Sequence, residues 1–152
     1  MDIVSKTVRS RMMSGIRGQD TKPELQVRRY LHANGFRFRL HDKRLPGHPD
    51  VVLPKYHVCI FVHGCFWHRH VSCRYATTPH TRADFWANKF ADNVRRDQEV
   101  RDRLLEMGWR IIVVWECGLK SKVPEMLDWL PDFIVSGPAF IVWPKGVKLG
   151  EN

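Results

Sequence analysis

The chain has 152 residues, 43% of them hydrophobic, and 25 lysines and arginines against 16 aspartates and glutamates give it a net charge of +9. This length suits one domain spanning 1–152, and the positive charge favours a nucleic-acid partner over charge that serves solubility alone. The charged N-terminus lacks the apolar segment of a secretory signal, and no apolar run approaches a membrane span of roughly 18 residues, so we expect a cytoplasmic protein without a membrane partner.

The first part of the chain predicts an arm, a helix and three strands. Residues 1–19 are polar and basic and predict an N-terminal basic arm or a short helix. A helix over 20–35 is favoured because Pro23 suits a first turn and Gly35 can end it. Three short strands are expected next, at 36–40, 49–53 and 57–63, and the last two should form a hairpin.

The second part of the chain alternates helices and strands. The expected elements are a helix over 81–107 with one possible break, a strand over 110–116, a helix over 123–134 and a strand over 139–144. This order predicts an α/β fold with a mixed central sheet flanked by helices.

An aspartate opens the first apolar strand of the predicted hairpin. Asp50 follows a Gly-His-Pro turn and His63 ends the next strand, so pairing of the strands can bring them close together. A carboxylate there can hold Mg²⁺, which can activate water and stabilise charge on a phosphate. Closure of the turn is an equally good explanation of Asp50. Glu24 suits helix capping by default, and it reaches Asp50 only if its helix packs across the strand ends.

Four residues have the chemistry of a structural zinc site. Cys65, His70, Cys73 and Cys117 could form a Cys₃His tetrahedron, provided that the strands before Cys65 and Cys117 are neighbours. Thiols stay reduced in the cytosol, which favours metal over disulfides. Cys59 lies between Val58 and Ile60 and is expected to be a small core residue.

The same stretch leaves two histidines outside the zinc set. His63 and His68 lie beside the predicted hairpin. Histidine changes its charge near neutral pH and can take a proton from water or give one to a leaving oxygen. An acid–base pair is therefore favoured over two ordinary polar side chains.

The whole pattern resembles a known family. "LPGHPDVV", "IFVHGCFWHRHVSC", "TRADFWANKFADNVRRD" and "LLEMGWRIIVVWEC", in this order and spacing, look like the very-short-patch repair (Vsr) endonucleases, and "RSRMMSGIRGQDTKPE" fits the same family. The resemblance covers about residues 7–118. It implies a restriction-endonuclease-like fold and a Mg²⁺-dependent nick in one strand of double-stranded DNA, beside a T·G mismatch left by deamination of 5-methylcytosine. The single set of site residues in the chain predicts a monomer, and mismatch-repair proteins are candidate partners.

The resemblance also implies a role for each site residue. Asp50 would bind Mg²⁺ together with the backbone carbonyl of Val62, His68 would be the catalytic base, and His63 and Glu24 would hold metal-bound waters. The zinc ligands would be Cys65, His70, Cys73 and Cys117. Phe66, Trp67 and Trp86 would form an aromatic wedge in the DNA, with the zinc loop holding Phe66 and Trp67 outward; burial in the core is the alternative for these aromatics.

Two other functions fit the composition. A zinc-stabilised DNA-binding module without activity would need neither Asp50 nor His68. A restriction-type endonuclease that makes double-strand breaks would need a dimer, and no dimerisation helix is obvious in the sequence. The bases around the mismatch and the side chains that read them do not follow from the sequence.

Overall fold

The fold is built on a five-stranded mixed sheet. The computed structural model describes residues 20–120 and 124–144, so the expected N-terminal arm over 1–19 lies outside the described residues. The strands, in sheet order, are β1 (Arg39–Leu40), β2 (Val51–Leu53), β3 (Val58–His63), β4 (Arg110–Trp115) and β5 (Phe140–Trp143). Neighbours from β1 to β3 are antiparallel and neighbours from β3 to β5 are parallel, which confirms the predicted mixed sheet and the hairpin.

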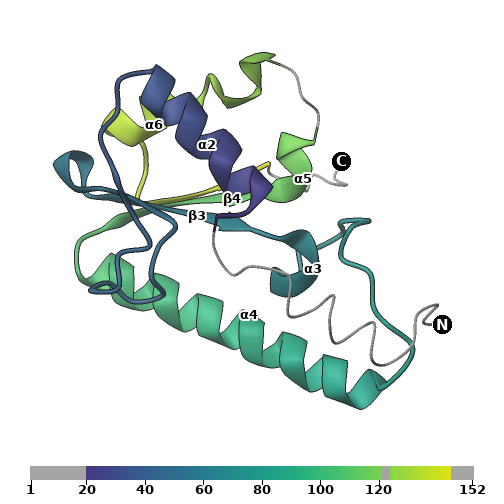
Figure 1. Cartoon of the computed structure of the whole chain (residues 1–152). Coiled ribbons are helices and arrows are strands. Elements are labelled where there is room, and N and C mark those ends of the chain that lie inside the picture. Colours follow the sequence, from purple (N-terminus) through teal and green to yellow (C-terminus); the bar gives the residue numbers. More distant parts are fainter. Residues whose placement is uncertain (1–19, 121–123, 145–152) are drawn as a thin grey trace.

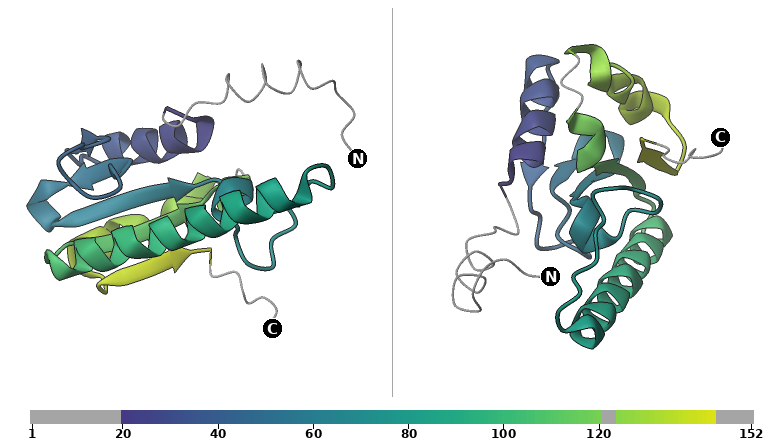
Figure 2. Two further views of the ribbon diagram at one scale, coloured as in Figure 1. Left: turned by 90° about the horizontal axis from the view of Figure 1, so that it is seen from below. Right: turned by 90° about the vertical axis from the view of Figure 1, so that its right-hand side faces the viewer.

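Helices cover both faces of this sheet. They are α2 (Lys22–Ala33), α3 (Cys65–His68), α4 (Ala83–Glu106), α5 (Glu116–Leu119) and α6 (Leu130–Ser136), with short 3₁₀ turns at Pro54–Tyr56 and Pro124–Leu127. In Figure 1, α2, α5 and α6 lie on one side of the sheet and α4 runs along the other. The two further views in Figure 2 show the same arrangement. The result is a three-layer α/β architecture.

The alternation of side chains along the central strands supplies a core to each layer. In β3, Val58, Ile60 and Val62 pack in the cluster with α2 and α6, whereas Cys59 packs with the α4 side. Successive side chains of a strand point to opposite faces of the sheet. Cys59 is fully buried, as expected of a small core residue.

The boundaries of several helices differ from the expectation. The helix over 81–107 is one unbroken α4, whereas the helix expected over 123–134 is a 3₁₀ turn followed by α6. Pro131 explains the second difference, because proline has no backbone N–H and is tolerated in the first turn of a helix. The helix before β1 begins and ends as predicted, and Gly35 adopts a left-handed φ of 83° after it.

Three other features were not predicted. The first strand is only two residues long. The stretch after β3 forms the one-turn helix α3 instead of an open loop, and α5 follows β4 without a gap. None of the helices within 20–120 and 124–144 is long and apolar enough to cross a membrane.

Candidate active site and metal centre

One cleft gathers most of the predicted catalytic residues. It has a volume of about 1220 Å³ and lies where the start of α2, the start of β2, the end of β3 and the middle of α4 meet. Its lining includes Glu24, Asp50, Val62, His63, His68 and Asp97. The sequence argument required a hairpin of β2 and β3 and a helix α2 that packs across the strand ends. The structure has both features.

Asp50 is a buried carboxyl group at the start of β2. Its side chain is 15% exposed, and its Oδ2 accepts a hydrogen bond of 2.7 Å from the backbone N–H of Val62 on β3. Burial raises the pKa of Asp50 to about 7; the Val62 hydrogen bond opposes this rise, and the nearby Glu24 carboxylate adds to it. A buried carboxyl beside a second carboxylate is poorly compensated, and a divalent cation would supply the missing positive charge.

Glu24 caps its helix and also belongs to the cleft. Its side chain is 3% exposed, and its carboxylate accepts hydrogen bonds from the backbone N–H of Asp20 at 2.9 Å and from Arg28 at 3.1 Å. The hydroxyl of Thr21, the N-cap of α2, accepts from the backbone N–H of Glu24 at 3.4 Å. The default capping role is present. Glu24 also lines the cleft together with Asp50, and its carboxylate contributes to the raised pKa of Asp50.

The two histidines form a stack that ends on an aspartate. The rings of His63 and His68 are parallel within 3° and their centroids are 3.9 Å apart. Nδ1 of His68 is 2.6 Å from Oδ2 of Asp97 on α4. Since an ionised carboxylate only accepts hydrogen bonds, Nδ1 of His68 donates, and its Nε2 is left to accept a proton. Burial lowers the pKa of His63 well below its ordinary value, so His63 is neutral.

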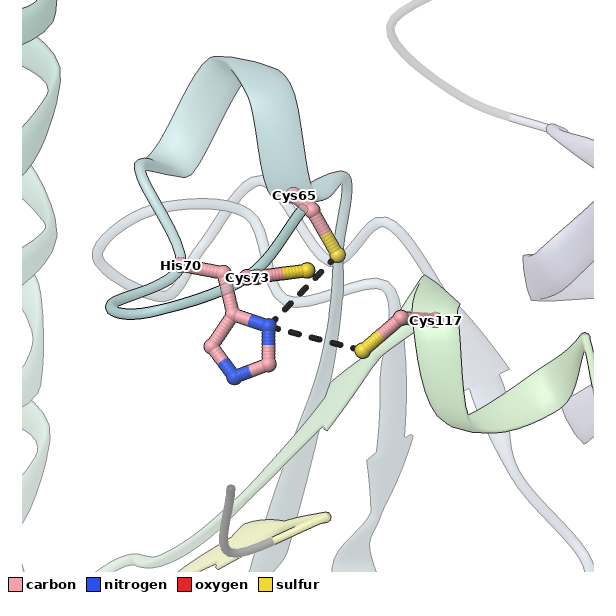
Figure 3. A group of neighbouring side chains, drawn as sticks. All are labelled: Cys65, His70, Cys73 and Cys117. Carbon is pink, nitrogen blue, oxygen red and sulfur yellow. Dashed lines mark hydrogen bonds between the residues drawn. The ribbon is translucent and has the colours of Figure 1, made fainter. Parts of the chain in front are cut away.

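The predicted zinc residues come together at the ends of β3 and β4. These two strands are parallel neighbours, so Cys65 and Cys117 emerge side by side. Figure 3 shows the three sulfur atoms and the His70 ring pointing toward one another. One ligand atom from each of Cys65, His70, Cys73 and Cys117 lies within 4.8 Å of all the others.

The distances in this cluster suit a tetrahedral metal ion. Nδ1 of His70 is 3.6 Å from Sγ of Cys65 and 3.4 Å from Sγ of Cys117. Zinc bonds of about 2.3 Å to sulfur and about 2.0 Å to nitrogen give a nitrogen–sulfur edge of about 3.5 Å in a tetrahedron. A neutral imidazole nitrogen has one lone pair, so it cannot accept well from two thiols at once. The four residues could therefore hold a metal ion.

The three predicted wedge residues lie in one aromatic cluster between α3 and α4. The ring centroid of Phe66 is 5.0 Å from that of Trp67 and 5.7 Å from that of Trp86. Phe66 and Trp67 are half-buried and line the cleft, whereas Trp86 is 8% exposed and packs against both rings. Phe66 and Trp67 are thus less outward than the sequence argument assumed.

The sequence argument missed three polar residues of the site. Asp97 lies in the helical stretch "TRADFWANKFADNVRRD", but nothing in its spacing sets it apart from the other acids of α4. Arg28 and His41 contact Glu24 through pairs separated by 4 and 17 positions in the chain. Only the Arg28–Glu24 spacing, one helical turn, is a signal that a sequence can give.

The chain is similar in sequence to known DNA-cleaving enzymes. The sequence model of the family "DNA mismatch endonuclease Vsr" matches residues 1–74. The "Type II nicking enzyme V.XorIIP" of Xanthomonas oryzae pv. oryzae is 47% identical over 133 residues, which cover 84% of this chain and 97% of that protein. The "DNA mismatch endonuclease Vsr" of Escherichia coli K12 is 43% identical over 121 residues, 80% of this chain and 77% of that protein.

A third relative is the "Type II nicking enzyme V.NmeAIP" of Neisseria meningitidis, which is 46% identical over 121 residues, 80% of this chain and 86% of that protein. Matches over 80% or more of this chain include β1 to β4 and the metal-binding cluster. The chain belongs to the Vsr family of DNA mismatch endonucleases and nicking enzymes.

Proposed function

We propose that this chain is a single-domain, Mg²⁺-dependent endonuclease that nicks the thymine strand beside a T·G mismatch and so starts very short patch repair of deaminated 5-methylcytosine. The observation that carries the proposal is the cleft in which the buried Asp50 carboxyl lies with the His68–Asp97 pair. We also propose that the fold is related to that of type II restriction endonucleases and that the protein acts in the cytoplasm, on the nucleoid.

Asp50 and the backbone carbonyl of Val62 are the proposed ligands of Mg²⁺. Hard oxygen ligands suit this ion, which usually keeps several waters. Glu24 and His63, which line the same cleft, are the proposed partners of such waters. When bound, Mg²⁺ would supply charge neutralisation at the scissile phosphate. Support comes from the raised pKa of Asp50, because a buried carboxyl that resists ionisation gains most from a nearby cation.

His68 is the proposed base. Asp97 accepts the proton of Nδ1 in a 2.6 Å hydrogen bond, which fixes the ring tautomer and leaves Nε2 as the atom that takes a proton from the attacking water. The neutral His63 ring stacked at 3.9 Å restricts the rotation of His68. A base held in this way typically contributes about 10²–10⁴-fold to a rate.

Phe66 and Trp67 are the proposed wedge residues, and Trp86 is the platform behind them. An apolar wedge must offset the cost of unstacking a base step, and a mismatched step unstacks more cheaply than a paired one.

The metal-binding cluster begins at Cys65, one residue before Phe66. We propose that zinc bound by Cys65, His70, Cys73 and Cys117 is structural and holds α3 in place.

The rival functions are less well supported. A DNA-binding module without activity leaves the His68–Asp97 pair and the buried Asp50 without a purpose. A restriction-type enzyme needs two active sites for two strands, whereas one chain supplies one set of these residues. We therefore favour a monomer, with mismatch-repair proteins as assisting partners.

Product analysis separates the three functions. Supercoiled plasmid with one T·G mismatch is incubated with protein in buffer with and without Mg²⁺; omission of Mg²⁺ is preferable to a chelator, which also removes zinc. We expect nicked circles only with Mg²⁺. Linear product from the first turnover would support the restriction-type enzyme, and binding without cleavage would support the DNA-binding module.

A further inference from the structure

Arg69 occupies a strained backbone position at the end of α3. It is the C-cap of this helix and has a left-handed φ of 55°, a conformation that glycine and asparagine adopt more readily than other residues. An arginine at this position therefore brings a cost in backbone free energy. The contacts of its half-buried guanidinium group explain why the fold keeps it there.

The guanidinium group of Arg69 donates all four hydrogens of its two terminal nitrogens. Nη1 is 3.1 Å from the carbonyl oxygen of Phe66 and 2.8 Å from that of Thr77. Nη2 is 3.1 Å from the carbonyl oxygen of Ala76 and 2.8 Å from the hydroxyl oxygen of Thr78. Each nitrogen has two hydrogens and two acceptors, so the group joins α3 to the loop that leads to α4.

The same guanidinium group lies over an aromatic ring of α4. Cζ of Arg69 is 3.9 Å from the ring centroid of Phe90, well within the range of a cation–π contact. Phe90 is 7% exposed, and its ring centroid is 5.2 Å from that of Phe66 and 5.5 Å from that of Trp86. Arg69 therefore contacts the aromatic cluster behind the proposed wedge as well as the helix that carries the wedge.

Helix α3 depends on contacts with other elements because it is only one turn long. A helix of this length is not stable alone, and the carbonyl groups at its end have no partner within the helix. Arg69 donates to the carbonyl of Phe66, and the side chain of Asn93 on α4 donates to that of Trp67 at 3.1 Å. The backbone of both proposed wedge residues is thereby tied to the rest of the fold.

We propose that Arg69 is a positioning residue for the wedge: its guanidinium group joins α3 to the loop before α4 and to Phe90, and so fixes the direction in which Phe66 and Trp67 meet the DNA. The inference rests on the proposed function of these two aromatic residues. It deepens that function, because it assigns a role in opening the mismatched step to a side chain that acts through α3 and not through the substrate.

The hydrogen bonds of Arg69 are tested first, by ¹⁵N NMR of the arginine side chains in the zinc-loaded protein without DNA. Four hydrogen bonds should stop rotation of the guanidinium group, so we expect separate Nη1 and Nη2 signals for Arg69, identified by their loss from the spectrum of Arg69→Lys. A freely rotating guanidinium group gives one averaged signal. An averaged signal for Arg69 in the wild type would overturn the inference, whatever the enzyme's activity.

Positioning of the wedge is tested second, by single-turnover nicking of a T·G duplex and of a duplex already unpaired at that step. An unpaired step needs little opening, so a misplaced wedge slows the T·G duplex more. Misplacement of a group by about 1 Å can cost about 10²-fold in rate. Since the metal-binding cluster still holds the other end of α3, we expect Arg69→Asn to lower the ratio of the T·G rate to the unpaired rate about tenfold. Asparagine suits the left-handed backbone, so this variant removes the guanidinium contacts without added strain.

Arg69→Lys separates positioning from charge. Lysine keeps the positive charge but cannot reproduce the planar fork of four hydrogens, so it should lower the ratio of rates about as much as Arg69→Asn. The matched control is Arg74→Lys, at an exposed arginine whose hydrogen bond and ring contact are both to the adjacent Tyr75. This control should leave the ratio unchanged. Thermal unfolding of each variant establishes that it is folded at the assay temperature.

Two results would overturn the inference alone. If the wild type nicks both duplexes and Arg69→Lys keeps its ratio of rates, charge and not positioning explains Arg69. If Arg69→Asn slows both duplexes by the same factor, Arg69 acts on His68, the base on the same helix, and not on the wedge. If the wild type nicks neither duplex, the proposed function fails, and the inference fails with it.

Discussion

Replacement of Asp50 by asparagine should make the Mg²⁺-free protein more stable while abolishing nicking. Burial raises the pKa of the Asp50 carboxyl from its ordinary value of 3.8 to about 7, so ionisation of this group in the folded, metal-free protein is unfavourable. Asparagine is uncharged, and its amide oxygen can still accept the hydrogen bond from the Val62 N–H. The substitution therefore removes the free-energy cost of the buried charge. It also removes the carboxylate that is the proposed ligand of Mg²⁺.

The magnitude follows from the two pKa values. Between pH 3.8 and about 7 the unfolded chain has lost this proton and the folded chain has kept it, so the unfolded state binds fewer protons and stability falls as the pH rises. At about 1.4 kcal/mol per tenfold change, this group costs about 4 kcal/mol above pH 7. We expect the advantage of Asp50→Asn to grow from about 1–2 kcal/mol at pH 5 to about 4 kcal/mol at pH 8.

The assay is urea unfolding of the zinc-loaded wild type and variant at pH 5 and pH 8, in buffer without Mg²⁺. Asp102→Asn, at an aspartate that is 67% exposed, is the control and should change the free energy of unfolding by less than about 0.5 kcal/mol. Equal stability of wild type and Asp50→Asn at pH 8 would refute the idea that Asp50 is an uncompensated buried carboxyl.

Three further outcomes are expected. Cys117→Ser should lower the zinc content of the purified protein and its melting temperature, because structural zinc contributes directly to folding free energy. The control Cys59→Ser should keep about one zinc per chain. Full zinc content in Cys117→Ser would remove Cys117 from the ligand set. His68→Ala should slow single-turnover nicking by about 10²–10⁴-fold and Asp97→Asn by about 10–100-fold, with DNA affinity retained in both; a pure loss of affinity would make His68 a phosphate contact. Trp67→Ala should reduce the preference for a T·G over a C·G duplex more than it slows cutting of a duplex already unpaired at that step, and an unchanged preference would contradict the wedge.

The sequence predicts most of the fold because its local signals agree with the tertiary packing. The continuous apolar runs of β3 and β4 specify buried strands, and the cap at Thr21 and the glycine after α2 mark a helix. Pro131 is an exception. The apolar pattern continues through this residue, but proline has no backbone N–H and fits only the first turn of a helix, so the new helix α6 begins next to it.

Part of the candidate site is likewise predictable from local sequence signals, and part depends on tertiary packing. The Cys65–Cys73 spacing and the position of Cys117 after a strand are local features, and the parallel pairing of β3 and β4 completes the cluster. Asp97, Arg28 and His41 act through contacts between elements distant in sequence, so only the packing of α2 and α4 on the sheet reveals them. The burial of Trp86 is likewise a product of the α3–α4 contact.

The most direct test of the proposed function is strand-specific cleavage of one labelled duplex. Each strand is labelled in turn, and the same position carries T·G, C·G, T·A or A·C, with zinc-loaded protein in excess and Mg²⁺ present. We predict a single nick in the thymine strand of the T·G duplex, with little cutting of the other three. Equal cutting of both strands, or equal cutting of the C·G duplex, would contradict the assignment of this cleft to a mismatch nickase.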